Sequence, residues 1–250
     1  LPGLDDTLEL RESRPGSKKH FASRVLVLVD LVPKPLRRPV EGALLLGAAG
    51  LSTGAVCGGE DKPLKSSEFQ PRLAYSLTLP SAAGETWWFT AGPHYDEGSK
   101  SRVKYAIDIT PTEKPRPCPG SEPYKGEFVR AIADGVVTVV GNEKNPNDKN
   151  HSVVEVDHGE GFASGYVHLD GMQVKVGQTV TQGAPLGYVS CEFPPGGGTS
   201  GQHLHLYGKI NGGPIEIDRM VMSGWTITGT GENKQGTMTK SREDVRTADT

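Results

Sequence analysis

The chain has 250 residues, and its 35% hydrophobic and 23% charged residues are the composition of an ordinary globular protein of one or two domains. Its 33 glycines and 19 prolines, about a fifth of the chain, disfavour long helices and favour short strands joined by turns. A formal net charge of -3 gives no basic surface for nucleic acid and no polybasic arm for a membrane.

Four segments are expected: an extension of unassigned role at 1–24, an export-signal-like segment at 25–57, a polar linker at 58–70 and a main domain at 71–250. In the second segment Lys34 and two arginines precede an apolar run at 42–56 that ends in small residues, the order of a secretory signal. The run is too short for a stable membrane span, and a weak interior helix is the alternative. Cys57 follows where a bacterial lipoprotein is acylated, although the preceding residues depart from the usual Leu-Ala-Gly.

Strand and turn signals fill the main domain. Strands are expected at 73–79, 86–90, 103–110 and, in short pieces, 174–189, and hairpins at 129–140, turned at Asp134-Gly135, and at 153–169, turned at 157–159. No run of ten residues has a convincing helical stripe, which excludes a doubly wound α/β fold with a phosphate loop. The fold class is therefore all-β, as a small antiparallel sandwich or half-barrel.

Two histidines in one apolar strand are the most specific feature. His203 and His205 are two residues apart, so both rings point to one face of the strand, about 6.5 Å apart along it, while Leu204 and Leu206 face the core. Two such histidines also occur for purely structural reasons on exposed strands. Here other candidate ligands accompany them, which favours a metal or catalytic site.

Those candidates are His94, Asp108 and His168. Asp108 interrupts an otherwise apolar strand, where a carboxylate is costly to bury unless it is paired or binds a metal. Each residue alone is better explained as a capping or hydrogen-bonded core residue, and only the combination favours a site. The remaining histidines, His20, His151 and His158, have polar or turn neighbours and are expected to be solvated.

Taken together, these motifs resemble the lysostaphin-type zinc endopeptidases, closest to the beta-lytic subgroup. The resemblance runs from about residue 73 to the C-terminal end and agrees in order and spacing at WWFTAGPH (87–94), AID (106–108), YVHL (166–169), SCE (190–192) and GQHLH (201–205).

This resemblance implies a fold of the duplicated-hybrid, lysostaphin-like type and a zinc endopeptidase domain at 71–250. His94, Asp108 and His205 would hold Zn²⁺, and His168 and His203 would flank the reacting carbonyl. Two departures stand out: many relatives place the first ligand where this chain has Lys104, and the proline-containing loop at 193–199 leaves the shape of the substrate channel open.

The residue types agree with this chemistry on their own. Two neutral imidazoles and one carboxylate leave zinc a net charge of +1 and an open position where water loses a proton near neutral pH. The chain lacks a His-Glu-x-x-His motif, so the base must be a histidine. We expect His203 to be the base and His168 to donate to the oxyanion or assist proton transfer, although the two roles could be exchanged.

The resemblance also implies a disulfide between Cys118 and Cys191, whose counterparts in the subgroup look bonded. Closing this interval would stabilise the fold by about 4 kcal/mol in the chain-entropy model. Cys57 would then be the odd cysteine.

The sequence thus predicts an exported, monomeric zinc metalloendopeptidase acting on stem or cross-bridge peptides of peptidoglycan. A non-catalytic murein-binding regulator on the same fold is the alternative, although such relatives lack ligands that this chain keeps. A lipoyl-type hairpin, suggested by residues 174–187, would need a lysine at its tip, and none is placed there.

Overall fold

The structure is a computed structural model that describes residues 65–70, 73–96, 101–119, 122–124, 127–142, 144–145 and 147–240, together with the backbone of residues 25–28. The expected extension at 1–24, most of the export-signal-like segment with Cys57, and the first part of the expected linker lie outside the described residues. Residues 25–28 form a strand that pairs with residues 86–89.

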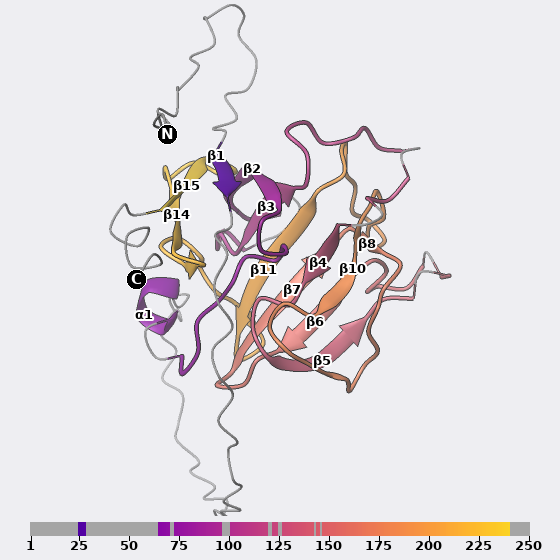
Figure 1. Ribbon diagram of the computed structural model, residues 1–250, viewed down its shortest axis with the longest axis horizontal. Helices are drawn as coiled ribbons and strands as arrows, with labels where there is room; N and C mark the ends of the chain where they lie inside the picture. The colour runs from indigo at the N-terminus through magenta and orange to yellow at the C-terminus, as the bar shows by residue number, and fades with distance from the viewer. Residues whose placement is uncertain are drawn as a thin grey trace, which may run out of the picture.

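The described residues form short strands and one four-residue helix (Figure 1). The elements are β1 Val25–Leu28, α1 Ser66–Phe69, β2 Thr86–His94, β3 Ala106–Thr110, β4 Phe128–Arg130, β5 Gly135–Val140, β6 Val154–Asp157, β7 Phe162–Val167, β8 Leu169–Asp170, β9 Thr179–Val180, β10 Pro185–Val189, β11 Leu204–Ile210, β12 Gly213–Pro214, β13 Val221–Met222, β14 Trp225–Gly229 and β15 Gly236–Lys240. No helix among these residues is long and apolar enough to cross a membrane.

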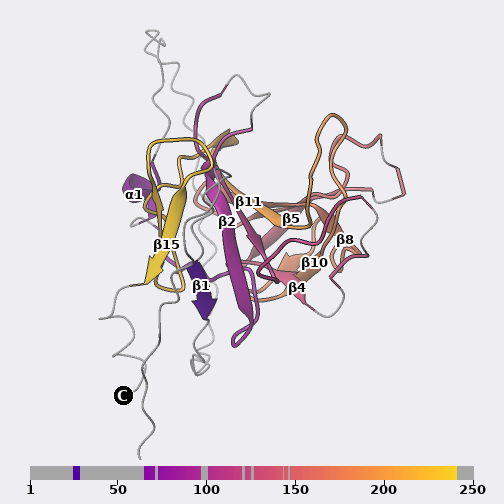
Figure 2. The ribbon, with the colours of Figure 1, turned by 90° about the horizontal axis from the view of Figure 1, so that it is seen from above.

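The strands belong to three antiparallel sheets within the described residues. The large sheet has the order β1-β2-β3-β11-β7-β6-β5-β9, with β12 added to β11, and the two small sheets have the orders β4-β10-β8 and β13-β14-β15. Figure 2 shows β15 beside β2, while β4, β8 and β10 gather at the opposite end. The predicted all-β antiparallel fold is confirmed.

One face of the large sheet is buried by the smaller sheets. A small apolar space is lined by Ile107 and Leu206 from the large sheet, by Ile132 just after β4, and by Met222 and Ile227 from β13 and β14. These side chains are almost inaccessible to solvent, and alternation along β3 and β11 turns the next residues of each strand to the other face. That other face is where the polar residues of β3 and β11 lie.

The strand expected at 73–79 is wrong, although its alternation has a physical basis. Leu77 and Leu79 are buried and Ser76 is exposed, as the pattern requires. The segment lies extended between other elements without joining a ladder: the Thr78 amide donates to the Ile132 carbonyl, and the Leu79 amide donates to the Ser223 hydroxyl. The alternation of apolar and polar residues therefore predicted which side chains are buried, but it wrongly predicted that the segment pairs with another strand.

The hairpin expected at 129–140 is also wrong, because its two halves belong to different sheets. β4 pairs with β10, whereas β5 pairs with β6 and β9. The hairpin expected at 153–169 is confirmed as β6 paired with β7, and the short pieces expected at 174–189 are β9 and β10.

Two further features attach outer segments to the fold. α1 lies within the expected linker, yet Ser66 and Phe69 are buried and the Ser66 amide donates to the Glu216 carbonyl. Cys118 and Cys191 form the predicted disulfide, which joins the loop after β3 to the loop after β10.

Candidate metal centre

Three neighbouring strands bring His94, Asp108 and His205 together. In β11 the Cα of His205 is paired with that of Asp108 in β3, and Ala106, two residues earlier in β3, is paired with His94 at the end of β2. Leu204 and Leu206, on either side of His205, are buried in the core at 0% and 4% exposure. The predicted alternation is confirmed for His205, whose ring lies on the face of β11 opposite to Leu204 and Leu206, while His203 lies just before the strand.

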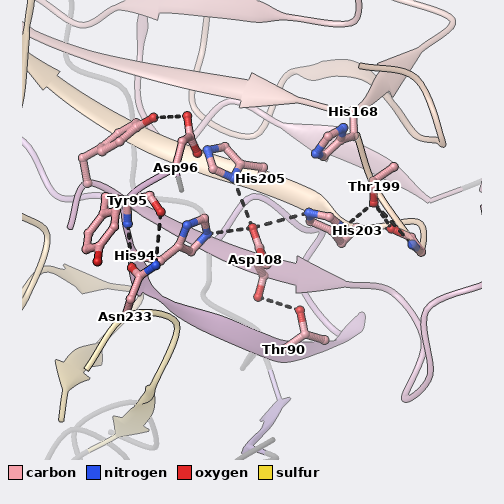
Figure 3. A network of polar contacts seen from close by, with 12 residues as sticks. Thr90, His94, Tyr95, Asp96, Asp108, His168, Thr199, His203, His205 and Asn233 are labelled. Atoms are coloured by element: carbon pink, nitrogen blue, oxygen red, sulfur yellow. Dashed lines mark hydrogen bonds and ion pairs between the residues drawn. The ribbon is translucent and has the colours of Figure 1, made fainter. Parts of the chain in front are cut away.

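The three side chains converge on one carboxylate oxygen, as Figure 3 shows. His94 Nε2 is 3.0 Å and His205 Nδ1 is 3.2 Å from Asp108 Oδ1. One ligand atom from each residue lies within 4.8 Å of the others, and both histidines are buried. The structure therefore places the three predicted ligands in reach of a single ion.

The carboxylate of Asp108 is held ionised in this cluster. Burial alone would raise the pKa of Asp108, but the electrostatic influence of nearby His203 and the hydrogen bonds with His205 and His94 hold that pKa well below its usual range. Burial would lower the pKa of His94, and the hydrogen bond to Asp108 reverses this and raises it. An ionised carboxylate facing two imidazole nitrogens is a donor set that fits a divalent transition metal.

His203 lies beside this cluster with its two ring nitrogens in different surroundings. Its Nδ1 is 2.8 Å from the Gly201 carbonyl and 3.3 Å from the Thr199 hydroxyl, and its Nε2 is 3.5 Å from Asp108 Oδ1. A carbonyl oxygen only accepts hydrogen bonds, so Nδ1 carries the proton. In the neutral ring, Nε2 is then the atom free to take a proton.

The ring of His168 lies close to the rings of His203 and His205. Its ring centroid is 4.6 Å from that of His203 and 6.2 Å from that of His205. Its Nδ1 donates to the Glu192 carbonyl at 2.8 Å, so its Nε2 also lacks a proton in the neutral ring. Burial, reinforced by His203, lowers the pKa of His168 to about 3.

The backbone of His168 has an uncommon conformation. Its φ of 67° is in the left-handed region, which a side chain with a Cβ rarely adopts, at the junction of β7 and β8. The Ser190 amide and hydroxyl both donate to the His168 carbonyl, at 2.7 and 3.0 Å. These two hydrogen bonds from Ser190 thus stabilise a backbone conformation that is unfavourable for His168 by itself.

Lys104, the position at which the sequence departs from the resemblance to the lysostaphin-type enzymes, makes contacts outside the cluster. Its Nζ donates to the carbonyls of Gly231 and Glu232 in the turn between β14 and β15. The same turn supports the segment after His94, because the Tyr95 amide donates to the Asn233 side chain at 3.0 Å. Lys104 therefore braces the loop next to the centre.

Sequence reasoning missed two tyrosines beside the centre. The rings of Tyr105 and Tyr207 lie 6.3 and 6.1 Å from that of His205. A Cβ at Gly165 would lie 2.0 Å from the Tyr207 ring, so glycine is needed for Tyr207 to lie against β7. Alternation could have found Tyr207, which is two residues after His205 and shares its face.

The expectation that His151 and His158 are solvated is wrong: they are 3% and 8% exposed. His158 bonds to the Asp134 carbonyl and the Ser164 hydroxyl, and His151 to the Asn142 carbonyl and the Glu192 carboxylate. Partners distant in sequence bury these residues despite their polar neighbours. His20 lies outside the described residues.

Part of the chain is similar to a known protein family. Residues 121–217 match the model of Peptidase family M23, a range that includes His168, His203 and His205 and begins after His94 and Asp108. The beta-lytic metalloendopeptidase of Lysobacter enzymogenes is 25% identical over 163 residues, which cover 63% of this chain and 82% of that relative.

One solved structure supports the fold, and a second is similar to a smaller part of the chain. The M23 metalloprotease pseudoalterin, from the deep sea, superposes with a TM-score of 0.52 at 23% identity, over 66% of this chain and 96% of its own. The catalytic domain of lysostaphin from Staphylococcus simulans gives a TM-score of 0.34 at 23% identity, over 49% of this chain and 81% of its own. Residues 121–217 are thus similar to the M23 peptidase family, and the chain is similar to the beta-lytic metalloendopeptidase over most of that relative's length.

Proposed function

We propose that the chain is an exported zinc metalloendopeptidase that hydrolyses stem or cross-bridge peptide bonds of bacterial peptidoglycan. The observation that carries this proposal is the convergence of His94 Nε2 and His205 Nδ1 on one oxygen of Asp108, with His168 and His203 beside them. The beta-lytic relative and the family match support the substrate class. The disulfide supports export, because such bonds persist in oxidising compartments.

His94, Asp108 and His205 would hold the zinc ion. Two imidazoles and one carboxylate are the ligand number and types of a catalytic rather than a structural zinc site. When bound in such a set, zinc acidifies a water molecule and polarises the scissile carbonyl. His203 is left out of the ligand set because its Nε2 lies farther from Asp108 Oδ1 than the ring nitrogens of the two ligand histidines.

His203 is the proposed general base. The Gly201 carbonyl holds the proton on Nδ1, so Nε2 takes the proton of the attacking water. The water oxygen bonds to the carbonyl carbon, the carbon–nitrogen bond breaks, and a proton passes to the leaving amine. Water and one peptide bond thus give one carboxylate and one amine.

His168 is proposed to assist proton transfer. Its Nδ1 proton is engaged by the Glu192 carbonyl, so the neutral ring has no proton on Nε2 to donate to an oxyanion. Of the two roles considered from the sequence, proton transfer through Nε2 fits this hydrogen bond better.

The test is the release of peptides from purified peptidoglycan. The wild-type protein should solubilise dye-labelled sacculi and create new amino termini that mass spectrometry assigns to one peptide bond. Chelation should abolish this release, and stoichiometric zinc should restore it. Binding to sacculi without any new amino terminus would contradict the proposal and favour the murein-binding regulator.

A further inference from the structure

The carbonyl that orients His168 belongs to Glu192, whose own position is fixed by its side chain. Glu192 Oε2 is 2.8 Å from Nε2 of His151, which lies 41 residues earlier in the chain. The Glu192 amide donates to the Ser190 hydroxyl, which in turn donates to the His168 carbonyl. Glu192 therefore connects His151 to the backbone and ring of His168.

The His151 ring is placed to carry a positive charge. Its Nδ1 is 2.9 Å from the Asn142 carbonyl, and its Nε2 faces the Glu192 carboxylate. Both partners only accept hydrogen bonds, so both ring nitrogens must be protonated when both bonds are made. Burial would lower the pKa of His151, but Glu192, the Asn142 carbonyl and the charge of Asp148 raise it, in agreement with this geometry.

The same segment supports His168 from its other side. Ser152, next to His151, has a φ of 63°, and its carbonyl accepts the amide of Leu169, the residue after His168. Ser152 thus holds the strand that follows His168, and His151 holds the loop whose Glu192 carbonyl accepts the hydrogen bond from His168 Nδ1. This loop carries the disulfide at Cys191 as well, directly before Glu192.

We infer that His151 and Glu192 are positioning residues for His168: their ion pair fixes the Glu192 carbonyl and thereby keeps the Nδ1-protonated form of His168, whose ring lies beside that of His203. Neither side chain touches the metal ligands in the described contacts. The inference rests on the proposed function for its catalytic consequence, while the state of the His168 ring can be measured without any substrate.

The experiment compares His151→Gln, Glu192→Gln and the double variant with the wild type. Glu160→Gln is the matched control, because Glu160 is an exposed acid in the turn between β6 and β7. The kcat and KM for peptidoglycan fragments, the zinc content, and the ¹⁵N chemical shifts of labelled histidines are recorded for each protein. The ring shifts report which nitrogen carries the proton.

In both single variants we expect kcat to fall by about 10- to 100-fold, by analogy with the loss caused by removing the outer hydrogen-bond partner of a metal-binding histidine. The KM and the zinc content should stay within about twofold, because no ligand is altered. The double variant should be no worse than the worse single variant, since the two residues act through one interaction. The His168 signals should move from the Nδ1-protonated form toward a mixture.

Wild-type ring shifts in both single variants would overturn the inference, whether or not the protein cleaves peptidoglycan. A loss of stability and zinc with wild-type kcat in the zinc-loaded fraction would overturn it too, because that is the result of a merely structural role. If His151→Gln does not fold, Glu192→Gln decides alone, since the Glu192 side chain is 52% exposed and tolerates substitution more readily. A wild type that cleaves nothing contradicts the proposed function, and the ring shifts still test the positioning.

Discussion

Two groups of buried histidine contacts in this molecule differ in how their hydrogen bonds are satisfied. Around His158 the polar groups form one continuous series of hydrogen bonds. Nδ1 donates to the Asp134 carbonyl, Nε2 is bonded to the Ser164 hydroxyl, and Ser164 is bonded to the Tyr166 hydroxyl, whose oxygen accepts the Ile132 amide. At the metal centre, nitrogens of His94, His203 and His205 all face one oxygen of Asp108.

The difference separates a structural use of histidine from a functional one. The series of hydrogen bonds that starts at His158 ends at the backbone amide of Ile132, and every polar group in the series has a partner. Such complete hydrogen bonding is how buried polar groups stabilise a fold. A carboxylate oxygen shared by three imidazoles is instead the geometry of ligands gathered for a cation. Burial alone would not distinguish them, because His94 is 3% and His158 is 8% exposed.

Among the substitutions that leave zinc binding intact, replacing the proposed base should cause the largest loss of kcat. We expect His203→Ala to lower kcat by about 10²- to 10⁴-fold, the usual contribution of a general base. The zinc content and the free energy of unfolding should change little, because His203 is neither a ligand nor a core residue. Single-turnover peptide release and metal analysis of the same preparation check this. An unchanged kcat would remove His203 from the mechanism and leave His168 as the candidate base.

Replacing His158 should give the opposite result. His158→Gln loses the bonds to Asp134 and Ser164 and should destabilise the fold by about 1–3 kcal/mol at pH 7, while kcat per folded molecule stays at the wild-type level. Denaturant unfolding measures the first quantity and active-site titration the second. If His158→Gln were as stable as the wild type but inactive, the assignment of a structural role to His158 and a functional role to the metal centre would be wrong.

The same variant should also change how stability depends on pH. Burial lowers the pKa of folded His158 below its ordinary value of 6.5, so below pH 6.5 the unfolded chain binds a proton that the folded chain does not bind. The stability from the neutral ring is complete above pH 6.5 and is lost as the pH falls. Between pH 7 and pH 5 the wild type should therefore lose more unfolding free energy than His158→Gln. Equal losses in the two proteins would contradict this assignment.

Sequence patterns predicted whatever depends on residues close together in the chain. Alternation predicted that His205 lies on the face of β11 opposite to Leu204 and Leu206, and turn residues predicted the β6–β7 hairpin, whereas His203 lies just before β11. The resemblance to a known family supplied the pairing of His94 with Asp108, which lie 14 residues apart, and the Cys118–Cys191 disulfide. From local patterns alone, each of these residues would have been assigned a purely structural role.

The failures share one physical cause, which is pairing over long distances in the chain. Residues 128–130 and 135–140 both have strand patterns, but their partners, β10 and β6, are chosen by the packing of separate sheets. His151 lies in a polar loop and becomes buried through Glu192, 41 residues away. Local polarity predicts exposure only where no distant partner compensates the burial of a polar group.

The most direct test of the account is the metal content of the purified full chain, measured after equilibration with zinc and removal of excess metal. The wild type and His203→Ala should each hold about one zinc ion per chain, whereas His205→Ala and Asp108→Ala should hold almost none. A wild type that retains no zinc, or a His205→Ala variant that retains as much as the wild type, would contradict the claim that His94, Asp108 and His205 form the metal centre.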